Sequence, residues 1–538
     1  MRNIVITAGL LLLTLSAYQN NSSKMSEETI TILQTADIHA YVNPHEELFV
    51  ENGRIVFRKA GGMAQIKTLT DSIRKLNPEG TLLIDGGDLI QGSGSSVRSQ
   101  GKIFSPIVQA MNYDLLIPGN WEVVYGKQIM LEVMNSYKTN VIVANMFDEE
   151  TSSALFPPYW ITEKKGVKIG FIAYNDPEVP IRQNPGYSEG MKFTPVEENL
   201  KQLIAQLKTE EKVDILFLVA HLGISKQVML ANHPAVEGVD FIFGNDTHER
   251  IRKPIKGKYA NVVEPGAFGS FVGRLDLKIK DKKLVDYTYE LIDVSPEKYK
   301  ADAEVQQRID QAIAPYQEEM QTILGYTSAP LYRYLVVENP MDNFITDALL
   351  WKTGADFAMS NGFRFGVPIV PGADGKAAVT KADLWRMLPV NEHMKIGKVT
   401  GQQIKNWMEQ EIHNVFAANY QERFGGWLVR FSGMTLKFDS SKAKGSRIES
   451  ITIQGKPLAL DQTYTMASCN RTGEPLSTMC RLKNTQDAEI QDYTMHEAIE
   501  EYLNMKGTIH PTLDGRAIAT DLGTQAFSQM KEGEYQFE

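Results

Sequence analysis

The chain has 538 residues, of which 43% are hydrophobic and 23% are charged. This composition is that of a globular protein able to bury a large core, and the length suits two large domains or three smaller ones. With 56 basic and 66 acidic residues, the formal charge is −10. Such a charge excludes the broad basic surface of a protein that binds nucleic acid polymers.

The first residues have the pattern of a secretory signal peptide. Arg2 precedes an apolar run over residues 4–15 and the small pair Ser16-Ala17, a run too short to span a bilayer. A disordered or buried N-terminal segment is the alternative. Tyr18 stands where a bacterial lipoprotein carries its cysteine, so no lipid is expected there. We predict a signal peptide over residues 1–24, export to the periplasm or the cell exterior, and no transmembrane anchor.

Residues 25–294 alternate short apolar strands with amphipathic helices, which is typical of an α/β domain. The predicted strands cover residues 30–33, 81–84, 115–117, 141–143, 168–173, 214–219, 241–243, 261–263 and 273–279. Helical spacing predicts a surface helix on the sheet that buries Val196, Leu200, Leu203, Ile204 and Leu207.

Polar residues recur just beyond the ends of these strands, where an open α/β sheet binds its ligands. They are Asp37, His39, Asp88, Asn120, His221, Asp246 and His248. Each histidine alone could be an ordinary hydrogen-bonded loop residue, but the recurrence favours one shared site. Asp88, on a glycine-rich turn, is well placed to bridge two metal ions. Imidazole and carboxylate without thiolate suit Mn, Fe, Zn or similar ions, and two such ions about 3.5–4 Å apart assist hydrolysis of oxyanion esters.

The ordered blocks D-x-H, G-D-x-x-Q, G-N-x-E, an isolated histidine after an apolar strand, and x-T-H resemble the calcineurin-like metallophosphoesterases. Together with the second half of the chain, they resemble the 5′-nucleotidase group of that family. The resemblance implies an N-terminal α/β/β/α sandwich, joined by a helix to a C-terminal α+β domain. Carried over by position, it implies that Asp88 bridges two divalent ions. One ion is then held by Asp37, His39 and His248, and the other by Asn120, His221 and Asp246.

Two residues depart from the family pattern. Trp121 stands where the third block carries a histidine that stabilises the transition state, and loss of one such donor costs about 10²–10³ in rate. Asp246 replaces a histidine of the last block, and either binds metal or forms a turn that faces solvent. As a ligand it would favour Mn or Mg over Zn, so we expect Mn, with Zn, Mg or Fe as the other candidates.

The string from Gly119 to Gly126 also resembles the Sox thiosulfohydrolase branch of this superfamily. Enzymes of that branch use two manganese ions to cleave a sulfate group from a cysteine-linked carrier protein. Residues 363–366 and 425–430 resemble the same branch. Asn120 stands where that branch is expected to carry histidine, so the chain is intermediate between the two patterns.

Residues 295–325 are charged and rich in glutamine, with Val305, Ile309 and Ile313 on one helical face. They are predicted to form a helix that connects the domains; an ordinary surface helix is the alternative. A second domain over residues 326–525 and a tail over residues 526–538 follow. Within this domain we predict a helix that buries Phe344, Ile345, Ala348 and Leu349, a helix over 401–416 and a strand over 427–431.

The resemblance also implies substrate-binding residues in the second domain. Asn361 and Arg364 resemble the family's N-x-x-x-R element, in which the arginine holds phosphate; a surface ion pair is the alternative for Arg364. Phe424 and Trp427 are candidates for an aromatic clamp on a base, with core residues as the alternative, and Trp121 is expected beside the substrate. The later aromatic of the family's G-G-D-G-[FY] element is missing from residues 471–475.

The chain has only two cysteines, Cys469 and Cys480. In an exported protein they could pair, and free thiols are the alternative. Two cysteines cannot build a thiolate metal site.

These patterns leave three functional hypotheses. The first is an exported dinuclear-metal hydrolase of phosphomonoesters, similar to 5′-nucleotidases, with Asn120 and Arg364 as catalytic residues. The second is a thiosulfohydrolase-like enzyme that acts on a sulfonate group of a carrier protein. The third is a metal- or nucleotide-binding protein in which catalysis is impaired.

Overall fold

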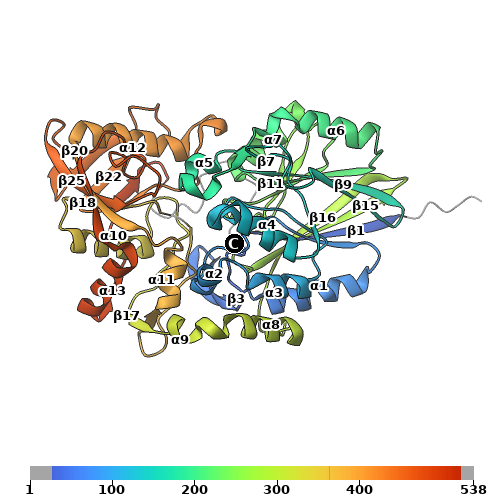
Figure 1. Cartoon of the computed structure of the whole chain (residues 1–538), viewed down its shortest axis with the longest axis horizontal. Helices are drawn as coiled ribbons and strands as arrows, with labels where there is room; N and C mark the ends of the chain where they lie inside the picture. Colours follow the sequence, from blue (N-terminus) through green and yellow to red (C-terminus); the bar gives the residue numbers. More distant parts are fainter. Residues whose placement is uncertain (1–26, 363, 523–538) are drawn as a thin grey trace, which may run out of the picture.

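The computed structural model describes residues 27–362 and 364–522. The predicted signal peptide over residues 1–24 and the tail over residues 526–538 lie outside the described residues. The N-terminal half, blue to green, and the C-terminal half, yellow to red, lie side by side (Figure 1).

The first sheet of the N-terminal half has the strand order β16-β15-β1-β4-β5-β6. Its strands are β1 (Glu28–Thr35), β4 (Thr81–Asp85), β5 (Leu115–Leu116), β6 (Asn140–Val141), β15 (Phe271–Lys280) and β16 (Lys283–Asp293). In this sheet β1, β4, β5 and β6 are parallel, whereas β15 pairs antiparallel with both of its neighbours. The carboxyl ends of β1, β4 and β5 therefore meet at one edge.

The second sheet has the order β13-β14-β12-β11-β9-β8. Its strands are β8 (Tyr159–Lys164), β9 (Val167–Asn175), β11 (Ile215–His221), β12 (Phe241–Gly244), β13 (Ile255–Lys256) and β14 (Asn261–Val263). Here β9, β11, β12 and β14 are parallel. Every strand predicted from the sequence is present, whereas β8, β13 and β16 were not predicted.

The two sheets pack face to face with helices on both outer faces. Apolar side chains such as Ile32, Leu82, Phe171 and Phe217 form the core between the sheets. The first sheet is covered by α1 (Met63–Leu76), α3 (Phe104–Met111), α4 (Lys127–Ser136) and α8 (Ala303–Ile313). The second is covered by α6 (Leu200–Thr209) and α7 (Ile224–Ala231). This arrangement confirms the predicted α/β/β/α sandwich.

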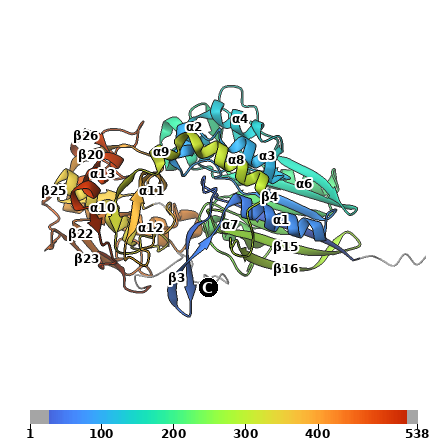
Figure 2. The same cartoon turned by 90° about the horizontal axis from the view of Figure 1, so that it is seen from below.

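Smaller elements complete this half. They are the hairpin β2 (His45–Glu51) and β3 (Arg54–Ala60), the pair β7 (Met146–Asp148) and β10 (Met191–Phe193), and the short helices α2 (Gly94–Ser99) and α5 (Val179–Arg182). The β2–β3 hairpin projects from the body of the molecule (Figure 2). In Figure 1, α5 lies where the two halves meet.

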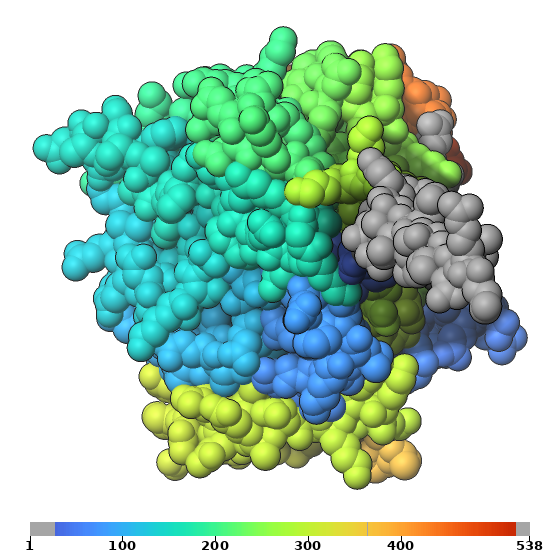
Figure 3. Space-filling model, turned by 90° about the vertical axis from the view of Figure 1, so that its right-hand side faces the viewer, coloured from blue at the N-terminus to red at the C-terminus, as the bar shows by residue number. Residues whose placement is uncertain are grey.

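The connecting segment over residues 295–325 is not one continuous helix. A 3₁₀ turn over Ala314–Tyr316, which contains a proline, separates α8 from α9 (Gln317–Met320), and strand β17 already begins at Ile323. The predicted apolar face of α8 is confirmed, because Val305 and Ile309 are buried against α1 and α3. Helix α8 therefore packs on the N-terminal half, along the lower edge of Figure 3.

The C-terminal half is α+β. Its sheets have the orders β21-β18-β25-β20-β26, β24-β23-β22-β28 and β19-β17-β27. The strands are β17 (Ile323–Thr327), β18 (Phe357–Ser360), β19 (Ala377–Thr380), β20 (His393–Thr400), β21 (Arg430–Ser432), β22 (Met434–Phe438), β23 (Ile448–Ile453), β24 (Lys456–Pro457), β25 (Thr463–Cys469), β26 (Gln486–Thr494), β27 (Thr508–Ile509) and β28 (Ala517–Ala519). The helices are α10 (Pro340–Thr353), α11 (Lys381–Met387), α12 (Gly401–Phe416) and α13 (Met495–Lys506).

Both predicted helices of this half are present. α10 buries Phe344, Ile345, Ala348 and Leu349, and α12 spans the predicted residues behind a capping box of Thr400 and Gln403. The predicted strand over residues 427–431 is shorter, since β21 begins at Arg430. Cys469 and Cys480 are both free thiols in this structure. None of the helices in the described part of the chain has the length and apolarity needed to cross a membrane.

Candidate metal centre

All seven predicted ligands lie at the same edge of the sandwich, where strands from both sheets end. Asp37 and His39 follow β1, Asp88 follows β4 and Asn120 follows β5. In the second sheet, His221 is the last residue of β11, and Asp246 and His248 follow β12. Every one of these side chains is buried. The structure thus brings together residues that are far apart in the sequence.

The backbone at this edge is unusual. Asp37, His39, Asp88, Asp246 and His248 all have positive φ angles, between 49° and 87°. Residues other than glycine rarely adopt this region, although aspartate and histidine do so more often than most. Clustering of such conformations at one place is typical of functional sites.

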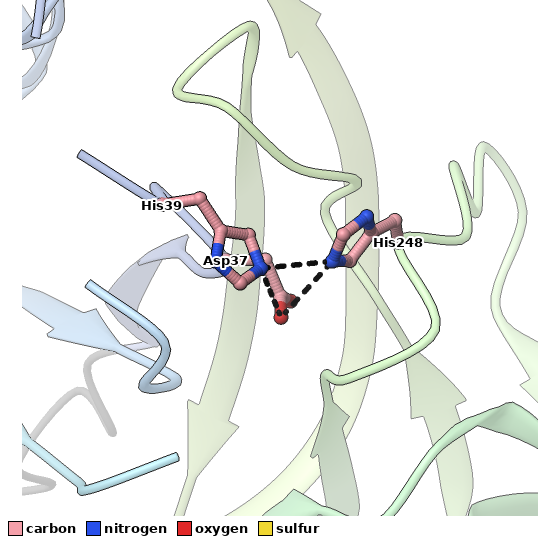
Figure 4. Close-up of side chains that lie close together, drawn as sticks. All are labelled: Asp37, His39 and His248. Carbon is pink, nitrogen blue, oxygen red and sulfur yellow. Dashed lines mark hydrogen bonds and ion pairs between the residues drawn. The ribbon is translucent and has the colours of Figure 1, made fainter. Parts of the chain in front are cut away.

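The first cluster consists of Asp37, His39 and His248, whose side chains point toward one another (Figure 4). The Nε2 atoms of the two histidines are 3.0 Å apart. Asp37 Oδ1 lies 3.9 Å from Nε2 of His39 and 3.7 Å from Nε2 of His248. Three ligand atoms at this spacing can converge on one ion.

The second cluster consists of Asp37, Asp88 and His221. Asp88 Oδ2 lies 3.2 Å from His221 Nε2 and 3.7 Å from His39 Nε2. Asp37 is common to both clusters, and the Asp88 carboxylate lies within 3.7 Å of a histidine of each.

Asn120 and Asp246 border the second cluster. Asp246 Oδ1 lies 3.8 Å from His221 Nε2 and accepts a hydrogen bond of 2.6 Å from Asn120 Nδ2. Rotation of the Asn120 amide about its last bond exchanges nitrogen for oxygen, which would present an oxygen ligand. Asp246 is buried, so it does not form a turn that faces solvent.

Backbone carbonyls set the orientation of two of the histidines. Nδ1 of His39 lies 2.8 Å from the carbonyl oxygen of Gln91, and Nδ1 of His221 lies 2.8 Å from that of Gly86. An Nδ1–H that donates to a carbonyl leaves Nε2 with its lone pair free for a metal ion. Among the described residues, the buried Nε2 of His221 makes no well-directed hydrogen bond, and Asp88 Oδ2 lies 3.2 Å from it.

The charge of the site also suits cations. Burial raises the pKa of Asp37 well above its usual value, and it raises that of Asp246 as well. Burial lowers the pKa of His39 to about 4. For His221 burial alone would lower the pKa, but the Asp88 carboxylate outweighs it and raises the pKa. Buried carboxylates beside imidazoles thus create a place where positive charge is strongly favoured, and divalent ions fit the donor set.

Glu122 supports the centre and was given no role by the sequence analysis. Its carboxylate accepts hydrogen bonds from the backbone N–H groups of Gly119 (2.6 Å), Asp88 (2.9 Å) and Leu89 (2.7 Å). Burial, together with the nearby Asp88, raises the pKa of Glu122 to about 7. One side chain therefore ties the loop after β4 to the loop after β5. The G-N-x-E block contains Glu122, so the signal was present in the sequence.

The C-terminal half reaches the centre through Phe365. The Phe365 ring centroid lies 4.3 Å from that of His39 and 5.4 Å from that of Trp121, edge-on in both cases. Gln91 makes a second link, because its Nε2 donates to the carbonyl oxygen of Pro389 at 2.7 Å.

The predicted substrate residues line the junction of the two halves. Trp121 and Asn361 border a cavity of about 70 Å³ that lies between the two halves. Arg364 is buried, and its Nη1 donates to the carbonyl oxygen of Thr247 (2.9 Å) and to Glu249 (3.2 Å). The alternative of a surface ion pair is therefore wrong for Arg364, since the ion pair that it makes is buried and crosses between the halves.

The candidate clamp residues Phe424 and Trp427 are half-buried. The Phe424 ring faces the guanidinium groups of Arg182 (5.9 Å) and Arg481 (5.6 Å), and the Trp427 ring faces Arg364 (5.7 Å). Both rings therefore lie beside cations at the junction rather than in the hydrophobic core.

Comparison with known families agrees with this geometry. Residues 30–254 match the family described as calcineurin-like phosphoesterase, and residues 323–471 match the 5′-nucleotidase C-terminal domain. Residues 30–254 thus belong to the calcineurin-like phosphoesterase family. The predicted resemblance is thus confirmed, and this metallophosphoesterase is a metal-dependent hydrolase of the 5′-nucleotidase type.

Its relatives are distant in sequence. The 5′-nucleotidase of Vibrio cholerae is 26% identical over 500 residues, which cover 82% of this chain and 85% of the relative. The trifunctional nucleotide phosphoesterase YfkN of Bacillus subtilis is 22% identical, and the match covers 90% of this chain. It covers 34% of YfkN, so the chain spans about a third of that relative.

Two solved structures share the fold over nearly the whole metallophosphoesterase. The sulfate thiohydrolase SoxB of Thermus thermophilus, in complex with glycerol, has a TM-score of 0.81 at 20% identity and covers 92% of this chain and 97% of its own. A 5′-nucleotidase precursor from Thermus thermophilus has a TM-score of 0.78 at 22% identity and covers 91% and 99%. At these identities the likeness concerns the fold alone.

Proposed function

We propose that this protein is an exported hydrolase of phosphomonoesters that works with two divalent metal ions, manganese by preference, and that nucleotides are its first class of substrates. The observation that carries the proposal is the convergence of Asp37, His39, Asp88, Asn120, His221, Asp246 and His248 on one buried edge. The curated relatives named 5′-nucleotidases support the choice of substrate class.

Different residues would bind the metal ions and the substrate phosphate. Asp37, His39 and His248 would hold one ion and His221, Asp246 and Asn120 the other, with Asp88 between them. Divalent ions in such a site activate water and neutralise charge on the attacking and leaving oxygens. Arg364 would orient the phosphate from the C-terminal half, because a guanidinium offers paired donors to tetrahedral oxyanions. Phe365 and Trp121, both buried, would shield the centre from bulk water.

The thiosulfohydrolase-like reaction is the second candidate. Trp121 favours it, since tryptophan at this position resembles the Sox branch and here lies edge-on to Phe365. A carrier protein would then be the natural partner.

The proposal is tested by metal analysis followed by assays with added Mn²⁺ on AMP, an aryl phosphate and a thiosulfonate. We expect close to two metal ions per chain and release of phosphate from AMP. Release of sulfate from the thiosulfonate alone would favour the second candidate. Bound metal with no turnover of any substrate would favour a binding protein and would overturn both enzymatic proposals.

Replacement of Trp121 tests whether the nucleotidase route is latent. Trp121→His supplies the imidazole that the family uses, so phosphatase activity is expected to rise by about 10²-fold. Trp121→Phe is the matched control, because it removes the indole without adding a proton donor. Equal rates for the two variants would argue against the nucleotidase route.

A further inference from the structure

The side chain of Arg182 places a positive charge beside the candidate metal centre. It is the last residue of α5, the short helix at the junction of the two halves (Figure 1). Its Nη1 donates to Asp176 Oδ2 at 2.5 Å and to Asp246 Oδ2 at 3.4 Å. The guanidinium is therefore in direct contact with one of the candidate ligands.

The remaining donors of Arg182 are available. In the described part of the chain, no hydrogen bond or ion pair uses its Nε or Nη2. The side chain lines the cavity that Trp121 and Asn361 share, and also a smaller pocket lined by Asp246 and Phe424. Arginine keeps its charge at any physiological pH, so a permanently charged side chain borders the space beside the centre.

Other cations at the junction are already engaged by protein acceptors. Arg364 donates to Thr247 and Glu249. Arg471, on the same cavity as Arg182, donates to the carbonyl oxygens of Ile181 and Gln183 and pairs with Glu474 at 2.8 Å. Trp121 can carry no positive charge, although it occupies the position at which the family places a histidine.

We propose that Arg182 is a catalytic residue that binds a non-bridging oxygen of the group being cleaved and supplies the positive charge that Trp121 cannot. The inference rests on the proposed hydrolase function and names the residue that replaces the missing histidine. In the reaction, a water oxygen forms a bond to phosphorus, the bond from phosphorus to the ester oxygen breaks, and a proton from the water ends on the released alcohol. Arg182 stays protonated throughout and stabilises the charge on the transferred group. It also offsets the extra negative charge that Asp246 brings to the site.

The first test measures anion binding, which requires no turnover. Arg182→Lys keeps the charge beside Asp246 but loses the forked donors. Titration of the Mn²⁺-loaded full-length protein with inorganic phosphate should give a Kd about 10- to 100-fold weaker for this variant. Arg308→Lys is the matched control, since Arg308 lies on α8 and pairs with Glu304 at 2.9 Å. The control should bind phosphate as the unaltered protein does. Equal phosphate affinity in Arg182→Lys would overturn the proposal.

The second test separates charge compensation from catalysis. Metal content and thermal midpoint are measured together with kcat and KM on the substrate that the unaltered protein turns over fastest. We expect Arg182→Lys to retain its metal and fold and to lose about 10²–10³ in kcat/KM. The loss in kcat/KM could disappear when the Mn²⁺ concentration is raised until the variant is saturated. Arg182 would then act only by positioning the metal ligand Asp246, and the proposal would be wrong.

The two failures are distinguishable. If the unaltered protein hydrolyses no phosphate ester, the proposed function fails, yet phosphate binding still shows whether Arg182 recognises the anion. The protein could hydrolyse phosphate esters while Arg182→Lys keeps the same phosphate Kd and kcat/KM. The proposed hydrolase function would then be supported, and the proposed role of Arg182 would be wrong.

Discussion

Glu122 shows how one residue can set the geometry of a centre that it does not enter. Its carboxylate accepts the N–H groups of Gly119, Asp88 and Leu89, and Asp88 in turn accepts the N–H of Trp121 at 2.8 Å. These bonds hold the loops that carry Asp88 and Asn120 at a fixed distance. Partners of this kind commonly affect metal affinity or activity by about 10- to 100-fold.

Glu122→Gln is predicted to lower metal affinity and hydrolytic rate by about 10- to 100-fold. The amide keeps the shape but turns one acceptor into a donor, so at least one buried N–H loses its partner. Metal titration of the metal-free protein, followed by activity at saturating metal, measures the effect. Glu132→Gln is the control, because Glu132 is exposed and, among the described residues, forms its ion pair with Lys102. Unchanged metal affinity in Glu122→Gln would show that the two loops keep their positions without the hydrogen bonds to Glu122.

At the scale of elements, the β2–β3 hairpin is anchored by a buried charge. Glu47 pairs with Arg250 at 2.6 Å, accepts a hydrogen bond from Ser270 at 2.6 Å, and accepts another from Tyr334 of the C-terminal half. The Arg250 guanidinium also lies 4.6 Å from the centroid of Phe271 and 4.8 Å from that of Tyr334. A hairpin that projects from the body is thereby held at its base by both halves.

Glu47→Gln is predicted to destabilise the protein by about 3 kcal/mol, since it removes one charge of a buried ion pair with Arg250. The control Glu46→Gln removes only a contact with Lys59, whose side chain is largely exposed, and should change stability little. Denaturant unfolding of both variants at neutral pH measures the difference. Equal unfolding midpoints would mean that the network contributes nothing.

The same network predicts a pH dependence. Burial alone would raise the Glu47 pKa, but Arg250, His45 and Ser270 outweigh it and lower the pKa from 4.5 to about 2. Because the folded pKa is lower than the unfolded one, the stabilisation is complete above pH 4.5 and is lost as the pH falls toward 2. The stability gap between the unaltered protein and Glu47→Gln should therefore shrink over that interval. A constant gap would contradict the assignment.

At the scale of the whole molecule, polar contacts hold the two halves together over the candidate centre. Arg471 Nη2 donates to the carbonyl oxygen of Gln183 at 2.5 Å, and Asn184 Nδ2 donates to Glu392 Oε1 at 2.5 Å. Gln91 bridges to Pro389 from the loop whose carbonyl orients His39. The contact between Gln91 and the C-terminal half is thus coupled to the orientation of the His39 ring. Closure of this kind commonly completes an active site.

Arg471→Ala is predicted to loosen this junction, because it removes charged hydrogen bonds worth about 1.5–3 kcal/mol each. Small-angle scattering should show a larger radius of gyration, and KM should rise by roughly tenfold. Lys398→Ala is the control, because Lys398 is exposed and pairs with Asp487 within the C-terminal half. A scattering profile identical to that of the unaltered protein would mean that other contacts suffice.

The sequence by itself determined the sandwich fold and the set of candidate ligands. Strand periodicity predicted nine strands of the two sheets, namely β1, β4, β5, β6, β9, β11, β12, β14 and β15. Short polar blocks after some of them marked Asp37, Asp88 and His221 as neighbours, because parallel strands end at one edge. It missed strands such as β8 and β16, in which most side chains are exposed or only partly buried. It also extended the connector past the proline-containing turn that follows α8. Local pattern alone does not resolve such boundaries.

Tertiary structure alone decided which residues beyond the motifs belong to the centre. Arg182 sits on a four-residue helix with no motif, and Phe365 and Pro389 approach from the other half of the chain. Their roles depend on contacts between segments separated by many positions, and no local spacing encodes such contacts. The buried position of Asp246 was decided in the same way, because burial results from the packing of both sheets and not from the turn that carries the residue.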